Sequence, residues 1–195
     1  MEWITDIRRM LVSFALLLCF YAAQSQEKVE REYRIKEGEV PAEALKFIDA
    51  CNFDKKIKWF REENESGSSI EAKVRRQNRR HSIEFSKTGV LEDIEIEIDF
   101  EELPANTKGK IISGLDELFA KWSIRKVQIQ YKGTTDKLLA LIREDVNTSL
   151  QKRYEIVLKA KKDRRLQMFQ ITTGQDGEIV EVQKIDLRST DNLEY

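Results

Sequence analysis

The feature that most constrains the fold of this chain is an internal repeat, in which a helical stretch is followed by four strand-like segments. One copy opens with Glu39-Val40-Pro41 before a helical stretch that reaches residue 54. The other opens with Glu102-Leu103-Pro104 before a helical stretch that reaches residue 119. Proline suits the first turn of a helix, where its missing N–H has no partner in any case. The repeat predicts two tandem units, residues 36–101 and 102–187.

Apolar residues recur at helical spacing in both helical stretches. The stripe of the second consists of Ile111, Leu115, Leu118 and Trp122, and that of the first of Ala44, Ile48 and Cys51. This spacing places each set on one helix face, which is typical of a helix packed on a core. Cys51 is therefore expected to be a small buried apolar residue and not a nucleophile.

The strand-like segments follow in the same order in both units. They are residues 56–61, 70–74, 82–85 and 91–100 in the first, and 124–131, 154–158, 168–171 and 178–185 in the second. Residues 91–100 alternate strictly, with apolar Ile94, Ile96, Ile98 and Phe100 opposite acidic Asp93, Glu95, Glu97 and Asp99. Such alternation is typical of a sheet with one buried and one solvated face.

The two units differ between their first and second strands. A short polar link, residues 62–69, is predicted in the first unit, and a helix capped by Thr134-Thr135-Asp136 in the second. The predicted fold class is α+β: two tandem helix-plus-four-strand repeats that form an antiparallel sheet with helices packed on one face.

The first 25 residues have the organisation of a secretory signal peptide. Arg8 and Arg9 precede an apolar run from Met10 to Tyr21, and Ala23-Gln24-Ser25 supplies small residues for cleavage after Ser25. A lipoprotein signal at Cys19 is the alternative, although Leu18 is larger than the residue that normally precedes such a cysteine. We expect a periplasmic or secreted protein with no transmembrane segment after cleavage, a linker at 26–35 and a C-terminal tail at 188–195.

Composition narrows the classes of function. The chain of 195 residues carries 34 Lys and Arg against 35 Asp and Glu, a balance that argues against a dedicated nucleic-acid binder. Its one histidine, His81, cannot supply a histidine-rich metal site, and we expect it to be a partly exposed residue at a strand end. Gly174 and Gly177 precede no helix and so form no phosphate loop. No catalytic residue, cofactor site or metal site is predicted, and the acidic row of residues 92–99 is interpreted as a solvated face.

Two surfaces remain as candidate binding sites. The open sheet face is predicted to carry Glu71, Lys73, Glu84, Glu95, Glu97, Lys126, Gln128, Gln130, Glu155 and Lys159, with Trp59, Phe60 and Tyr131 as possible aromatic anchors. Two equivalent hairpin tips are basic and comprise Arg75, Arg76, Arg79 and Arg80 in the first unit and Lys161, Lys162, Arg164 and Arg165 in the second. These tips either hold an anionic surface or are simply solvated ends that resist edge aggregation.

The chain resembles the PepSY-like proteins of bacterial envelopes. The likeness rests on Trp59-Phe60, residues 69–74, residues 82–85 and residues 89–96, and in the second unit on residues 124–135 and 154–157. This resemblance implies a fold similar to the beta-lactamase inhibitor protein, in which two helix-plus-sheet repeats present a concave sheet to a protein partner. It carries no catalytic signature and assigns no contact residue.

These observations give three hypotheses of function. The leading one is a non-enzymatic envelope module that binds, inhibits or modulates a protein partner through its open sheet face. The others are a sensor or carrier of a small anionic ligand or metal ion, and a hydrolase with an unfamiliar site. The identity of the partner and the oligomeric state are not encoded in any recognisable motif.

Overall fold

The computed structural model describes residues 27–28, 31–64, 67–147 and 149–185. Their strands form one ten-stranded sheet in the order β1-β10-β9-β8-β7-β6-β5-β4-β3-β2. Neighbouring strands pair antiparallel, except for a parallel contact between β1 (Glu27–Lys28) and β10 (Ile179–Ile185). The predicted α+β class with an antiparallel sheet is confirmed.

A helix precedes four consecutive strands in each half of the chain. In the first half α2 (Ala42–Cys51) leads into β3 (Lys58–Asn64), β4 (Gly67–Arg76), β5 (Arg79–Ser86) and β6 (Leu91–Glu97). In the second, α3 (Ala105–Leu118) leads into β7 (Trp122–Lys132), α4 (Thr135–Glu144), β8 (Gln151–Lys162), β9 (Arg165–Thr173) and β10. The exact limits of the two sequence units and the duplication itself stay predictions.

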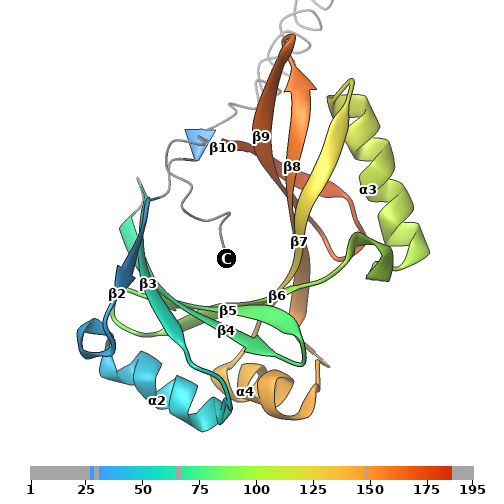
Figure 1. Cartoon of the computed structure of the whole chain (residues 1–195). Coiled ribbons are helices and arrows are strands. Elements are labelled where there is room, and N and C mark those ends of the chain that lie inside the picture. Colours follow the sequence, from blue (N-terminus) through green and yellow to red (C-terminus); the bar gives the residue numbers. More distant parts are fainter. Residues whose placement is uncertain (1–26, 29–30, 65–66, 148, 186–195) are drawn as a thin grey trace, which may run out of the picture.

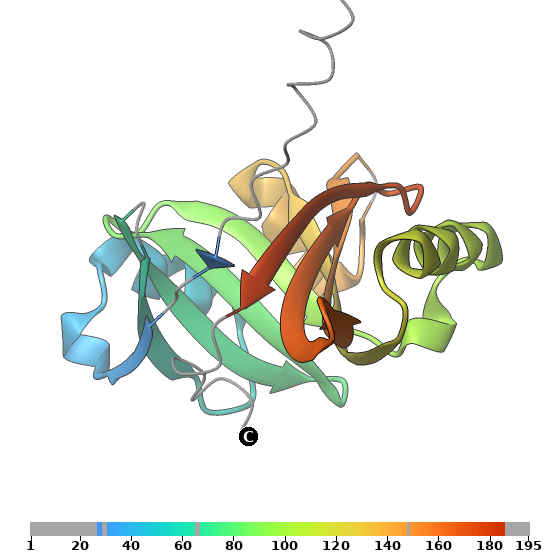
Figure 2. The ribbon, with the colours of Figure 1, turned by 90° about the horizontal axis from the view of Figure 1, so that it is seen from above.

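The sheet bends around a central space, and the helices lie on its outer, convex side (Figure 1). Helices α2 and α4 lie beneath β4 and β5, whereas α3 lies outside β7. The view from above shows α2 and α3 at opposite ends of the sheet (Figure 2). The concave side of the sheet carries none of the labelled helices, so its side chains are available to line a site.

Two apolar cores hold the helices to the convex side. The core of the first half joins Ala44, Phe47 and Cys51 of α2 with Ile83 and Phe85 of the sheet. The Phe47 and Phe85 rings meet edge to face, with centroids 5.9 Å apart, a favourable geometry for aromatic packing. The core of the second half joins two residues of α3, Ile111 and Leu115, with β7, β8 and β9. Cys51 is buried as predicted, and burial raises the pKa of its thiol to about 12.

Several sequence predictions need correction. Residues 31–35, assigned to a linker, form the edge strand β2 (Arg31–Ile35), which pairs with β3. Most of the polar link at 62–69 belongs to β3 and β4, because these strands pair as far as Asn64 and Gly67. Leu118 is exposed and Trp122 lies in β7, since α3 ends one turn before the predicted stripe does.

Two predictions about individual residues also differ from the structure. His81 is buried and not partly exposed, because its side chain turns to the helix-covered side of β5; its Nδ1 lies 3.3 Å from the carbonyl oxygen of Arg79. Thr134 occupies the N-cap position of α4 but makes no capping side-chain hydrogen bond. The predicted signal peptide, its cleavage site and the tail at 188–195 lie outside the described residues.

Candidate functional site

A hollow of about 820 Å³ occupies the concave side of the sheet. All of the predicted face residues except Lys159 line it. Alternate residues of a strand point to the same side, so the even–odd pattern read from the sequence places these polar groups together. Carboxylates from β3 to β8 line the hollow together with basic residues that include Lys58, Arg80 and Arg125.

Three carboxylates stand directly opposite one another on adjacent strands at the floor of this hollow. Glu71 of β4 pairs in register with Glu84 of β5, and Glu84 pairs in register with Asp93 of β6. Side chains directly opposite across an antiparallel pair have their Cβ atoms only about 5 Å apart, and like charges there are destabilising. We call Glu71, Glu84, Asp93 and the adjacent Glu95 the acidic floor.

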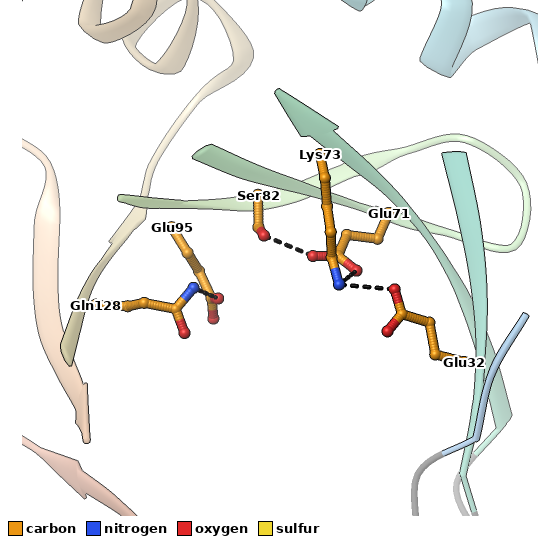
Figure 3. Close-up of polar contacts among 6 residues, drawn as sticks. All are labelled: Glu32, Glu71, Lys73, Ser82, Glu95 and Gln128. Carbon is orange, nitrogen blue, oxygen red and sulfur yellow. Dashed lines mark hydrogen bonds and ion pairs between the residues drawn. The ribbon is translucent and has the colours of Figure 1, made fainter. Parts of the chain in front are cut away.

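Lys73 supplies an internal positive charge at one end of the acidic floor. Its Nζ lies 2.7 Å from Oε1 of Glu32 and 3.0 Å from Oε2 of Glu71, as Figure 3 shows. Ser82 donates a hydrogen bond of 2.5 Å to the other oxygen of Glu71. Both oxygens of Glu71 therefore contact a group of the chain, although Oε2, beside Lys73, accepts no hydrogen bond from the described residues.

Glutamine side chains serve the carboxylates at the other end. Gln128 donates to Glu95 at 2.8 Å, and Gln130 donates to Asp93 and to Glu155 at 3.3 Å each. Glu155 also accepts a hydrogen bond of 2.6 Å from Gln170. Amide donors orient these carboxylates without neutralising their charge.

Three carboxyls of the acidic floor, Glu84, Asp93 and Glu95, have raised pKa values. Burial, and then the charges of Glu71 and Glu62, raise the pKa of Glu84 well above its usual range. Burial, and then the charge of Glu155, raise the pKa of Glu95 in the same way. Burial raises the pKa of Asp93 to about 6 although Lys132, 3.4 Å away, opposes the shift. The acidic row was interpreted as a solvated face, and the burial of Asp93 corrects that interpretation.

The two basic hairpin tips are not equivalent in the structure. In the first, Arg79 is ion-paired with Glu102, and Arg76 lies 3.8 Å from Asp145 at the end of α4. Arg75 and Arg80 line the hollow. In the second tip, Lys161, Lys162, Arg164 and Arg165 are exposed around the turn. The first tip is thus partly neutralised by the fold, whereas the function of either tip stays a prediction.

The aromatic candidates are mostly used for packing. Trp59 and Tyr131 are buried in the first core and therefore pack inside the fold. Phe60 is half-buried, and Nζ of Lys73 lies 4.7 Å from the centre of its ring. Two contributors were missed from the sequence: Glu32, on a strand assigned to the linker, and Glu62, assigned to a polar link. Their positions become visible only when the edge pairing of β2 and β3 is known.

Carboxylate oxygens of Glu62, Glu71 and Glu84 lie within 4.8 Å of one another, which is a spacing compatible with a cation. The oxygens of Glu71 already contact Lys73 and Ser82. A metal ion at this trio would therefore stand close to an ammonium group, which weakens its attraction. The trio offers only oxygen ligands, which suit hard cations such as Ca²⁺.

Comparisons with known proteins identify relatives of the fold. No family model and no curated protein matches the chain, so the PepSY-like resemblance is not confirmed. Similar solved structures include a DUF2874 family protein from Bacteroides ovatus, with a TM-score of 0.51, 12% identity and coverage of 74% of this chain and 87% of that one. A putative periplasmic protein from Bacteroides eggerthii has a TM-score of 0.53 and 13% identity, with coverage of 79% and 94% respectively.

A BLIP-like protein from Bacteroides fragilis is more distant, at a TM-score of 0.46 and 14% identity, with coverage of 80% of this chain and 92% of that one. The likeness to the beta-lactamase inhibitor protein stays a prediction. None of the described helices combines the length and the apolar composition needed to cross a bilayer. The chain is therefore similar in fold to solved structures of Bacteroides proteins, one of which is described as periplasmic.

Proposed function

We propose that this protein is a non-enzymatic binding module of the cell envelope that binds a protein partner in the hollow of its sheet. The observation that carries the proposal is the acidic floor, where Glu71, Glu84 and Asp93 oppose one another across three strands. A sheet that only had to be stable would not retain facing carboxylates, since each such pair costs free energy. Polar groups kept at such a cost are typical of functional sites.

The shape and chemistry of the hollow favour a protein ligand. Its lining is mainly charged and amide side chains, and small-molecule pockets are predominantly apolar. Interfaces of proteins that associate transiently are more polar than obligate interfaces and have a polar rim. Export to the envelope is supported by the signal-like sequence of the first 25 residues and by the periplasmic description of one structural relative.

A second candidate function is the binding of a divalent cation, which the spacing of Glu62, Glu71 and Glu84 favours. An anionic small ligand fits the hollow poorly, because the carboxylates at its floor would repel it. A thermal-shift assay with Ca²⁺ and Mg²⁺ tests this candidate, since a cation bound to the native state alone must raise the melting temperature.

The test of the main proposal compares three forms of the protein as immobilised baits in an envelope extract of the source cells. The forms are the unaltered protein, Glu84→Gln with Glu95→Gln on the concave side, and Glu43→Gln with Glu117→Gln on the convex helices. Both double variants replace two glutamates by glutamine, so they are matched in the chemistry of the substitution. We expect a partner that the unaltered and the convex-side baits capture and the concave-side bait does not. Equal capture by all three baits, or no capture by any, would contradict the proposal.

A further inference from the structure

The described residues place cations beside only part of the acidic floor. Lys73 sits between Glu32 and Glu71 at one end, and Lys132 lies beside Asp93 at the other. Between them, Glu84 has Glu71 directly across on one side and Asp93 on the other. Within the described residues no ion pair or hydrogen bond to the Glu84 carboxylate is present. At the centre of the floor, Glu84 therefore lacks a cationic partner among the described residues.

A second observation points to a missing partner at the same place. Asp93 is only 5% exposed and lines the hollow. Its Oδ2 accepts from Gln130, but its Oδ1 is buried without any hydrogen bond from the described residues. A buried polar atom left unsatisfied costs free energy, and such atoms are rare in native structures. A donor that enters the hollow between Glu84 and Asp93 would remove this cost.

The ligand that satisfies these groups must be cationic and must offer several donors. Glu84 lies on β5, and Asp93 and Glu95 lie on β6. A ligand that binds all three carboxyls therefore needs several hydrogen-bond donors that point in different directions. A guanidinium group presents five N–H donors in a planar fork, is always charged, and binds carboxylates in a bidentate manner. An ammonium group is a compact point charge that suits the sites already held by Lys73 and Lys132.

We propose that the acidic floor receives an arginine side chain carried by a loop of the protein partner, with Glu84, Asp93 and Glu95 as its acceptors. This inference rests on the proposed function and specifies the chemistry of the partner. The hollow of about 820 Å³ has room for such a side chain together with part of the loop that carries it. Buried arginine residues are common centres of binding energy in protein interfaces.

The test uses the unaltered protein and two capped pentapeptides, Gly-Gly-Arg-Gly-Gly and the same peptide with citrulline, the neutral isostere of arginine. Peptide is titrated into ¹⁵N-labelled protein, and the amide resonances of β5 and β6 are followed by NMR. We expect the arginine peptide to shift these resonances with an affinity at least about tenfold higher than the citrulline peptide, which is a difference of about 1.4 kcal/mol.

Two variants test whether the arginine peptide binds at Glu84 or is attracted only by the overall charge of the protein. We expect Glu84→Gln to weaken binding of the arginine peptide about tenfold, and Glu117→Gln, which removes an exposed carboxylate of α3, to leave it unchanged. Equal binding of the two peptides, equal effects of the two variants, or no shift up to the solubility limit of the peptide would overturn the inference. So would shifts at β5 and β6 produced by Ca²⁺ but not by the arginine peptide. A partner captured equally by Glu84→Gln and unaltered baits would overturn this inference and leave the proposed function standing.

Discussion

Glu71 and Glu84 lie directly opposite each other on β4 and β5, and both side chains line the hollow on the concave side of the sheet. Glu71 contacts Lys73 and Ser82, whereas Glu84 faces a second carboxylate, Asp93, on β6. Glu71, at one end of the acidic floor, therefore has a lysine beside it, whereas Glu84, at the centre, has none among the described residues. We expect replacement of Glu84 to stabilise the fold and to weaken binding of the partner.

Glu84→Gln should stabilise the protein at neutral pH. The pKa of Glu84 is raised, so the free-energy cost of this group is present above its folded-state pKa and is absent below its unfolded-state pKa, about 4.3. At pH 7 we expect the variant to melt at a higher temperature than the unaltered protein. The difference should be about 2–4 °C for each kcal/mol that the substitution adds to the free energy of unfolding. The difference should shrink at pH 4. A variant that is less stable at pH 7 would show that the Glu84 carboxylate is stabilising.

Because of Asp93, the free energy of unfolding should fall as the pH rises. Burial raises its pKa from 3.8 to about 6, so the native state binds the proton more tightly than the unfolded state does. The resulting stabilisation is complete below about pH 4 and is lost as the pH rises to about 6, and two pKa units correspond to about 3 kcal/mol. Chemical unfolding between pH 4 and 7 measures this slope. Asp93→Asn should flatten it, and Glu117→Gln should not.

The alternation of β6 in the sequence was sufficient to place its carboxylates on one face. It was not sufficient to predict that Asp93 is buried, since that depends on the bending of a sheet whose strands come from both halves of the chain. The bend brings Gln130 of β7 against Asp93. A period of two residues specifies which side a residue faces but carries no information about the curvature of that side.

Edge strands were the least predictable part of the fold. Residues 31–35 are mostly charged and lack the apolar alternation of a central strand, so they resembled a linker. Charged residues are common on edge strands because they discourage pairing with other chains. Glu32 was missed for this reason, although it completes the contacts of Lys73. Helix α3 was predicted correctly, but Trp122 was wrongly added to its apolar stripe, because it continues the helical spacing beyond Leu118, where the helix ends.

Lys73→Met should strongly destabilise the protein. The substitution keeps the length of the side chain and removes the charge between Glu32 and Glu71, whose side chains are each only 4% exposed. Removing one partner of a buried ion pair costs about 3–5 kcal/mol because a buried charge is left uncompensated. Urea unfolding at pH 7 measures the loss, and the deficit should narrow at acid pH, because burial raises the pKa of Glu32 above its usual range.

The matched control for Lys73→Met is Lys110→Met. Lys110 also contacts two carboxylates, Asp176 at 2.8 Å and Glu178 at 3.0 Å, but both are more than half exposed. Exposed ion pairs contribute about 0–1 kcal/mol. The two variants should therefore differ by several kcal/mol although each removes one lysine charge. Equal losses would mean that burial of the Lys73 contacts is not what makes them important.

Gly177→Ala should loosen the hairpin between β9 and β10 from α3. Gly177 has a φ of +92°, which side-chain-bearing residues rarely adopt, and a Cβ there would lie 2.5 Å from the backbone oxygen of Thr107 in α3. The Cβ would be fixed to the backbone of the hairpin, and the oxygen belongs to the backbone of α3. The contact is therefore relieved only if the hairpin or the helix moves. We expect a loss of about 1–3 kcal/mol in urea unfolding. Gly38→Ala is the control, since its Cβ would meet nothing within 4 Å. If both variants unfold at the same urea concentration, the close approach of the hairpin to α3 contributes nothing to stability.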